Sequence, residues 1–74
     1  MCDVFRKVRL KAELNQITLA KRLKRPQSYV SKIESGDLGI DPVEMFHWAE
    51  ACDTEPWLVF GEFVIAMIRR HKIP

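Results

Sequence analysis

Apolar residues recur at intervals of three and four along most of the chain, which is the period of an amphipathic helix. Between short breaks, this pattern predicts helices over residues 4–12, 16–23, 27–35, 42–51 and about 56–60. In the segment 16–23 the apolar positions are Ile17, Leu19, Ala20 and Leu23. The expected fold class is therefore all-α.

The breaks between these segments contain residues that start and stop helices. Asn15 is suited to cap the second helix, and Gly36 is suited to end the third. Pro26 cannot continue the second helix but can begin the third. Two later breaks, Asp41-Pro42 and Thr54-Glu55-Pro56, place a capping residue before a proline, as helix starts often do.

Residues 16–36 form the most informative stretch, two short helices joined by a tight turn. In the second helix Val30 and Ile33 share one face, which leaves a polar face made of Gln27, Ser28, Ser31 and Lys32. Such side chains carry the donors and acceptors that read base edges in a DNA groove. A helical hairpin with a solvated polar face would show the same spacing, so periodicity alone leaves both interpretations open.

The same stretch resembles the helix-turn-helix of the Cro/phage-repressor (XRE) family, and the likeness covers residues 4–60. The residues that carry it are Gln16, Leu19-Ala20, Leu23, the uninterrupted run from Gln27 to Gly36, Ile40-Asp41, Val43-Glu44, Trp48-Ala49 and Ala51. The resemblance implies a five-helix, lambda-repressor-like DNA-binding domain. It also implies that the helix 27–35 enters the major groove of double-stranded DNA.

The resemblance assigns roles to individual residues. The expected base contacts are Gln27, Ser28, Ser31 and Lys32, and the expected phosphate contacts are Gln16, Lys24, Arg25 and Tyr29. Lys32 could equally take a phosphate, and Tyr29 could equally be an ordinary half-buried aromatic residue. Further basic candidates for phosphate are Arg6, Lys21 and Arg22. In the family an arginine and a glutamate at the positions of Arg9 and Glu34 form an internal salt bridge.

The chain departs from the family in two respects. Three helix ends where the family commonly has glycine hold Glu13, Lys24 and Asp53, and a left-handed conformation there costs on the order of 1 kcal/mol. The loop from Gly36 to Gly39 also lacks the cations that grip phosphate in many relatives. We therefore expect modest DNA affinity for a single subunit.

Composition bounds the remaining possibilities. A length of 74 residues suits one domain near the lower limit for a self-sufficient core. Cys2 and Cys52 are too few for a disulfide framework and are expected to be reduced thiols in a cytoplasmic protein. No signal-peptide pattern or bilayer-spanning segment is evident. The two cysteines and two histidines lack zinc-ligand spacing, so neither a metal nor another cofactor is expected.

The net charge is only +2, but the charges are unevenly placed. Residues 6–32 contain nine basic residues and a single acid, whereas residues 33–68 contain eight acids and no lysine or arginine. A solvated surface can also carry runs of one charge. Because the basic run coincides with the motif, we interpret it as the half of the molecule that faces a polyanion.

Residues 61–74 form an extra apolar C-terminal helical segment beyond the family core of residues 4–60, and Gly61 either breaks the fifth helix or lets it continue. This end of the chain is richer in apolar residues than one small core can bury. A sixth helix that folds back would absorb some of them, but we expect a homodimer. The candidate dimer contacts are Phe60, Phe63, Val64, Ile65, Met67 and Ile68.

These observations predict a sequence-specific transcriptional regulator, a repressor that binds a palindromic operator as a dimer. The alternative is a protein-interaction module, such as an antitoxin whose main partner is another protein. An enzyme is not expected, because His47 and His71 have no partnered serine, cysteine or carboxylate that suggests catalysis.

Overall fold

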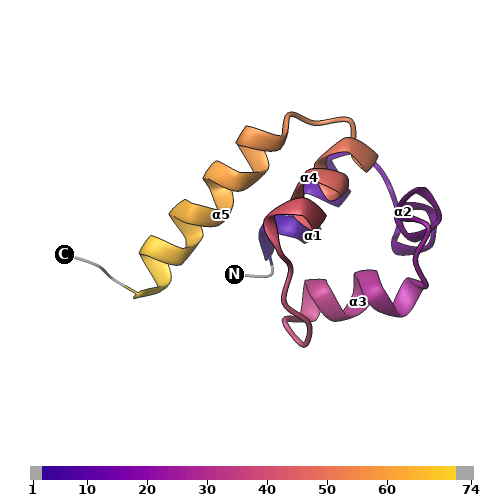
Figure 1. The fold of residues 1–74 in the computed structure, drawn as a ribbon, viewed down its shortest axis with the longest axis horizontal. Helices are drawn as coiled ribbons and strands as arrows, with labels where there is room; N and C mark the ends of the chain where they lie inside the picture. The colour runs from indigo at the N-terminus through magenta and orange to yellow at the C-terminus, as the bar shows by residue number, and fades with distance from the viewer. Residues whose placement is uncertain (1–2, 72–74) are drawn as a thin grey trace.

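The computed structural model describes residues 3–71 and contains five helices in that range, with the order shown in Figure 1. Their bounds are α1 Asp3–Lys11, α2 Gln16–Leu23, α3 Gln27–Ser35, α4 Pro42–Ala51 and α5 Pro56–His71. The all-α class and the expected bounds of α2, α3 and α4 are confirmed, and α1 is shifted by one residue. Cys2 and residues 72–74 of the extension lie outside the described residues.

The local capping signals explain why the helices begin where they do. The side chain of Asn15 accepts a hydrogen bond from the Thr18 amide at 2.7 Å, which satisfies one free donor of α2. Asp41 and Glu44 form a reciprocal capping box at the start of α4, with Pro42 in its first turn. Pro26 stands at the start of α3 without a side-chain cap.

Three turns adopt a left-handed backbone without glycine. Glu13, Lys24 and Asp53 have φ values of 61°, 57° and 54°, at the three positions where the family commonly has glycine. The chain therefore keeps these turns at a cost on the order of 1 kcal/mol each. Gly36, with φ of 87°, supplies the corresponding turn after α3 at little cost.

The core lies where α1 to α4 meet the first half of α5. Its most deeply buried large side chains are Leu19, Val30, Trp48 and Val59. The Trp48 ring meets the Phe5 ring edge-on, with ring centroids 5.5 Å apart, and its Nε1 donates to the Phe5 carbonyl at 3.2 Å. In the loop between α3 and α4, Ile40 packs against the core, whereas Leu38 remains 41% exposed.

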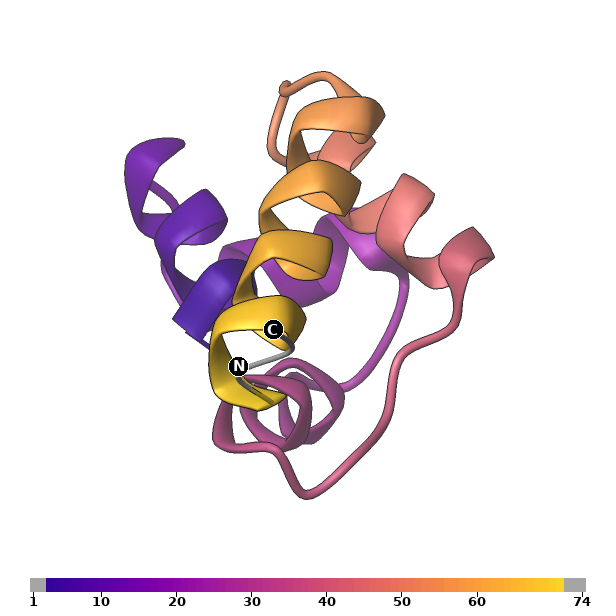
Figure 2. The ribbon, with the colours of Figure 1, turned by 90° about the vertical axis from the view of Figure 1, so that its left-hand side faces the viewer.

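Helix α5 is longer than the expected segment of residues 56–60. Gly61 does not break it, and the helix continues to His71. Figure 2 shows α5 in front, with α1 on one side of it and α4 on the other. Val59 is buried here, and Phe63 packs against Phe5 with ring centroids 5.8 Å apart. This packing offsets the helix cost of one glycine, about 1 kcal/mol. Beyond Phe63, α5 extends away from the other four helices (Figure 1).

Candidate nucleic-acid interface

The inner side of α3 is fixed by a buried ion pair. The Arg9 guanidinium donates to Glu34 through two bonds, Nε to Oε2 at 2.6 Å and Nη2 to Oε1 at 3.0 Å. Arg9 and Glu34 are only 8% and 3% exposed. The third guanidinium nitrogen of Arg9 donates to the Leu14 carbonyl at 2.9 Å, so the pair ties α3 to α1 and to the turn before α2. The ion pair expected between these two residues is therefore present.

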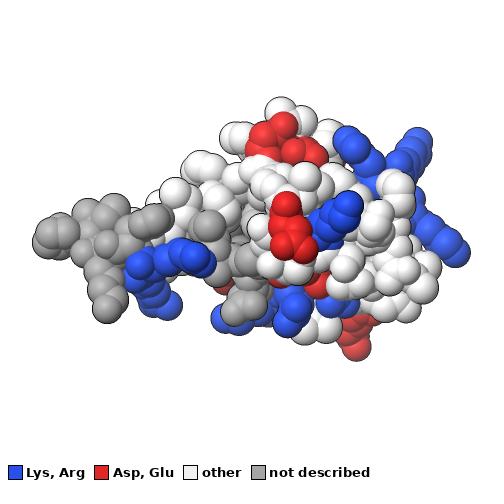
Figure 3. Space-filling view, turned by 90° about the horizontal axis from the view of Figure 1, so that it is seen from below, with Lys and Arg blue, Asp and Glu red and all other residues white. Residues whose placement is uncertain are grey.

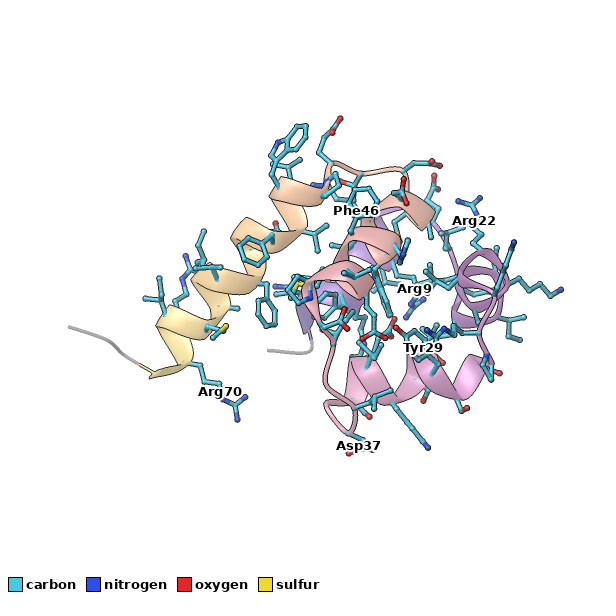
Figure 4. All side chains as sticks on the ribbon, viewed as in Figure 1. Arg9, Arg22, Tyr29, Asp37, Phe46 and Arg70 are labelled. Atoms are coloured by element: carbon cyan, nitrogen blue, oxygen red, sulfur yellow. The ribbon has the colours of Figure 1, made fainter. Side chains whose placement is uncertain are left out.

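The surroundings of Arg9 favour its charged form. The hydrogen bonds that Arg9 donates to Glu34 raise the pKa of Arg9 further above its already high ordinary value, although burial acts in the opposite direction. Figure 4 shows Arg9 in the interior between the helices, where paired hydrogen bonds replace water. Because both groups are nearly inaccessible, loss of either partner would leave an uncompensated buried charge.

A chain of hydrogen bonds leads from this pair to the outer surface. Gln16 Nε2 donates to Glu34 Oε1 at 3.1 Å, and Gln27 Nε2 donates to Gln16 Oε1 at a longer 3.4 Å. Gln16 is half-buried, whereas Gln27 is exposed at the start of α3. The side chain at the start of α3 is therefore oriented, through Gln16, by the same carboxylate that fixes the helix.

This orientation leaves Gln27 able to recognise a base. Its amide nitrogen carries two hydrogens, of which Gln16 uses one, and no described side chain donates to its carbonyl oxygen. One free donor and one free acceptor are what a bidentate contact with adenine N7 and N6 requires. Gln27 could thus contact a base without losing its bond to Gln16.

The outward face of α3 remains polar and accessible. All four expected base contacts, Gln27, Ser28, Ser31 and Lys32, are exposed in the structure. On the opposite face Val30 and Ile33 are buried in the core. The helix therefore presents a row of polar side chains on a backbone that is held against the core, which suits insertion into a groove.

Tyr29 has a different environment from the rest of α3. Its hydroxyl donates to Glu44 Oε2 at 2.5 Å, while Glu44 Oε1 accepts the Asp41 amide, so one carboxylate joins α3 to the start of α4. Burial is the main cause that raises the pKa of the Tyr29 hydroxyl, and the bond to Glu44 adds to it. Figure 4 shows Tyr29 between α3 and α4. A phosphate contact through this hydroxyl would require it to leave Glu44.

Three basic residues at the end of α2 and in the α2–α3 turn fall into two groups. Lys24 and Arg25 are exposed, and the Arg25 guanidinium lies 4.9 Å from the centroid of the Tyr29 ring. Arg22 instead donates to the Ala51 carbonyl at the end of α4 at 2.7 Å and lies 3.6 Å from Asp53. Lys24 and Arg25 thus remain available for an anion, whereas Arg22 is engaged within the protein.

Charge over the α3 side of the molecule is mixed rather than uniformly positive. Figure 3 shows this side with lysine and arginine at one end and along one edge, and with acidic side chains between them. Asp37, just after α3, accepts a hydrogen bond from Ser35 Oγ at 3.2 Å. The loop that follows α3 therefore carries an acid close to the candidate DNA-binding helix, which weakens attraction to phosphate.

The fold and the exposed polar helix define a helix-turn-helix DNA-binding domain. Residues 5–56 match the family described as helix-turn-helix. A solved structure, an XRE-family like protein from Pseudomonas syringae pv. tomato str. DC3000, is 31% identical with a TM-score of 0.78. The alignment covers 88% of this chain and 79% of that one. No curated protein matches the chain.

The chain belongs to the XRE-type helix-turn-helix family, which the motif residues from Gln16 to Gly36 had indicated. This is a family of DNA-binding regulators and not of enzymes. The family match ends at Pro56, where α5 begins, so most of α5 lies beyond it. None of the helices in residues 3–71 has the length and apolar character needed to cross a membrane.

Two features of the site were missed by sequence reasoning. The bonds from Gln16 to Glu34 and from Tyr29 to Glu44 join residues 18 and 15 positions apart, on different helices. Helical periodicity describes spacing within one helix and does not predict contacts between residues on different helices. A partial signal was available for Glu44, because an acid three residues after Asp41 forms a capping box and places that carboxylate at the start of α4.

Proposed function

We propose that this chain is a sequence-specific transcriptional repressor that binds a palindromic operator as a homodimer, in the cytoplasm where the DNA lies. The observation that carries the proposal is the hydrogen-bond chain from the buried Arg9–Glu34 pair through Gln16 to Gln27. It supports a recognition helix whose first side chain is held ready for a base edge. Preorganisation of this kind reduces the conformational entropy that is lost on binding.

The proposed contacts divide into two kinds. Gln27, Ser28, Ser31 and Lys32 would read base edges in the major groove, which selects the sequence. Lys24, Arg25 and Gln16 would hold phosphates, which fixes the position of the protein without selecting a sequence. The amide groups at the start of α2 would add a favourable dipole for the phosphate beside Gln16. Tyr29 would join them only if it released Glu44.

In this proposal, dimerisation compensates for the weak phosphate binding of a single subunit. The acid at Asp37 and the absence of lysine and arginine from residues 36–40 limit what one subunit can gain from phosphates. Two linked subunits would bind two half-sites about one helical turn apart. Binding of the second half-site then becomes intramolecular, which raises the overall affinity without new contacts in either subunit.

DNA selection from a random pool, followed by salt titration on the winning site, tests the proposal. We expect a site with two-fold symmetry and a linear fall of log affinity with log salt, at about 0.9 per phosphate neutralised. Selection that enriches no sequence would overturn sequence-specific recognition. A site without two-fold symmetry would overturn the palindromic dimer.

A second candidate function, supported by the apolar outer side of α5, is that of an antitoxin-like module whose main partner is another protein. Trp57, Leu58 and Ile65 are 68%, 55% and 49% exposed, which is unusual for side chains of this kind. The two candidates differ in what they require of α3. If Gln27→Ala and Lys32→Ala leave biological activity intact, the protein-interaction function is correct and the regulator function is not.

A further inference from the structure

Helix α5 carries apolar residues on three sides, although only one of these sides meets its own core. Its apolar residues, together with Gly61, form three rows along the axis. The inner row is Val59, Phe63 and Ala66, the side row is Trp57, Phe60, Val64 and Met67, and the outer row is Leu58, Gly61, Ile65 and Ile68. The inner row is buried or half-buried, while every large side chain of the other two rows is exposed. Two exposed apolar rows on one helix form a patch of the kind that marks an interaction site.

The outer row faces away from the body of the molecule. Ile65 follows Phe63 by two residues, which is about 200° around an α-helix, and Phe63 packs against Phe5 in the core. Ile65 therefore points nearly opposite to the core. At its start the outer row borders α1, because Leu58 lines a hollow together with Lys7 and Leu10. Farther along, α5 extends beyond the other helices (Figure 1), so a second helix could pack on this part of the outer row without meeting α2 to α4.

The spacing of the outer row is that of a helix pair. Leu58, Gly61, Ile65 and Ile68 follow one another at intervals of three, four and three residues. This is the repeat by which two helices pack side chains of one into gaps of the other. The side row has the same spacing, so apolar character alone does not choose between the two rows.

Charge distinguishes the two rows. Glu62 and Arg69 lie along the same edge of the outer row, seven residues or about 10.5 Å apart. Both are exposed, and neither forms an ion pair with another described residue. The side row has no such pair of opposite charges along either edge. The outer row is therefore the one flanked by two opposite charges, Glu62 and Arg69, that could form ion pairs with a second copy of the helix.

We infer that two copies of this chain pair through the outer rows of α5 in antiparallel orientation, with the two-fold axis near Ile65. In this arrangement Glu62 of each copy lies beside the partner's Arg69, and two ion pairs form. In a parallel pair Glu62 would lie level with the partner's Glu62, and Arg69 with the partner's Arg69. The inference rests on the self-association proposed above and not on DNA recognition.

Two matched variants test which row pairs. Ile65 in the outer row and Phe60 in the side row are both 49% exposed, so a charge at either site should spare the fold equally. In sedimentation equilibrium without DNA, Ile65→Glu should weaken the dimer by about a hundredfold or more, because it buries a carboxylate in an apolar contact. Phe60→Glu should leave the dimer within a few-fold of the parent. Circular dichroism checks that both variants remain helical.

Charge reversal tests the orientation. Glu62→Arg and Arg69→Glu should each weaken the dimer by about tenfold, since each turns two attractive pairs into repulsive ones. The double variant should restore the parent affinity, because antiparallel pairing recreates both ion pairs. Failure of the double variant to recover would overturn the antiparallel orientation.

The remaining outcomes are equally decisive. Dissociation by Phe60→Glu but not by Ile65→Glu would overturn the choice of row. A parent that stays monomeric at every concentration would overturn self-pairing, and it would leave α5 to a different protein. Since none of these measurements uses DNA, they can fail while the DNA selection succeeds, and the reverse.

Discussion

Helices α3 and α5 each turn one side away from the core, and the two sides have opposite chemistry. The outward side of α3 is built from glutamine, serine and lysine, whereas the outer row of α5 is built from leucine, glycine and isoleucine. Their anchors also differ, because α3 is held by a buried ion pair and α5 by Val59 and Phe63. The polar outward side of α3, held in place by the buried ion pair, suits a polar ligand that requires fixed hydrogen-bond geometry. The apolar outer row of α5 suits a partner with an apolar surface.

The anchor of α3 should produce the largest loss when it is broken. Glu34→Ala leaves the Arg9 charge buried without a partner, and we expect the free energy of unfolding to fall by about 3–5 kcal/mol. That is a large part of the stability of a small domain. Urea denaturation measures the change. Glu34→Gln retains hydrogen-bonding capacity and should lose less, while the exposed control Glu50→Ala should stay within about 0.5 kcal/mol of the parent.

The end of α4, just before α5, carries a buried thiol, Cys52, that should make stability depend on pH. Burial raises the pKa of Cys52 from 9.0 to about 11. A raised pKa means that the unfolded chain releases this proton first, so stability is complete below pH 9 and falls as pH rises toward 11. The expected loss is about 1–3 kcal/mol in denaturation curves across this range. In Cys52→Ala this part of the slope should vanish, and an unchanged slope would show that the thiol is not its source.

The hydrogen bond from Tyr29 to Glu44, which also holds α3, should contribute less to stability than the Arg9–Glu34 ion pair. Tyr29→Phe removes the hydroxyl that donates to Glu44 but keeps the ring beneath Arg25. We expect a loss of about 0.5–1.5 kcal/mol in urea denaturation, the usual net contribution of one hydrogen bond. A variant as stable as the parent would mean that the tyrosine bond does not hold α3 against α4.

Helix α5 should be the region where a single substitution most easily raises the unfolding free energy. A Cβ at Gly61 meets no atom within 4 Å, so Gly61→Ala should raise the unfolding free energy by about 0.5–1 kcal/mol through better helix propensity. Gly36→Ala is the contrasting variant, because φ of 87° disfavours any side chain and should cost about 1 kcal/mol. Equal effects of the two alanines would mean that α5 is not a continuous helix at residue 61.

Local chemistry determined most of what the sequence could predict. Asn15, Pro26 and Asp41-Pro42 mark helix starts through their own side chains, and three helix bounds were therefore correct. Whether the fifth helix continues past Gly61 stayed open from the sequence, because glycine is a weak helix former whose cost is offset by packing between distant residues. Phe63 was expected at a dimer contact, yet it packs on the core of its own chain.

The candidate site divides in the same way. The exposed row from Gln27 to Lys32 follows from helical periodicity. The Arg9–Glu34 pair followed only from resemblance to the family, because nothing in the sequence brings residues 25 positions apart together. The bonds through Gln16 and Glu44 depend on how three helices cross, which no local pattern encodes. Local sequence patterns thus predicted the exposed face of α3 but not the hydrogen bonds that hold its opposite side.

The central claim is that Gln27, oriented from the buried ion pair, reads a base. Binding of Gln27→Ala and Lys24→Ala to the selected site and to every single-base-pair variant of it tests this claim most directly. Gln27→Ala should lose about 1–3 kcal/mol of discrimination at one base pair and keep it elsewhere. Lys24→Ala should weaken binding to all sequences alike. If Gln27→Ala also weakens all sequences alike, or changes none, α3 does not read DNA through its first residue.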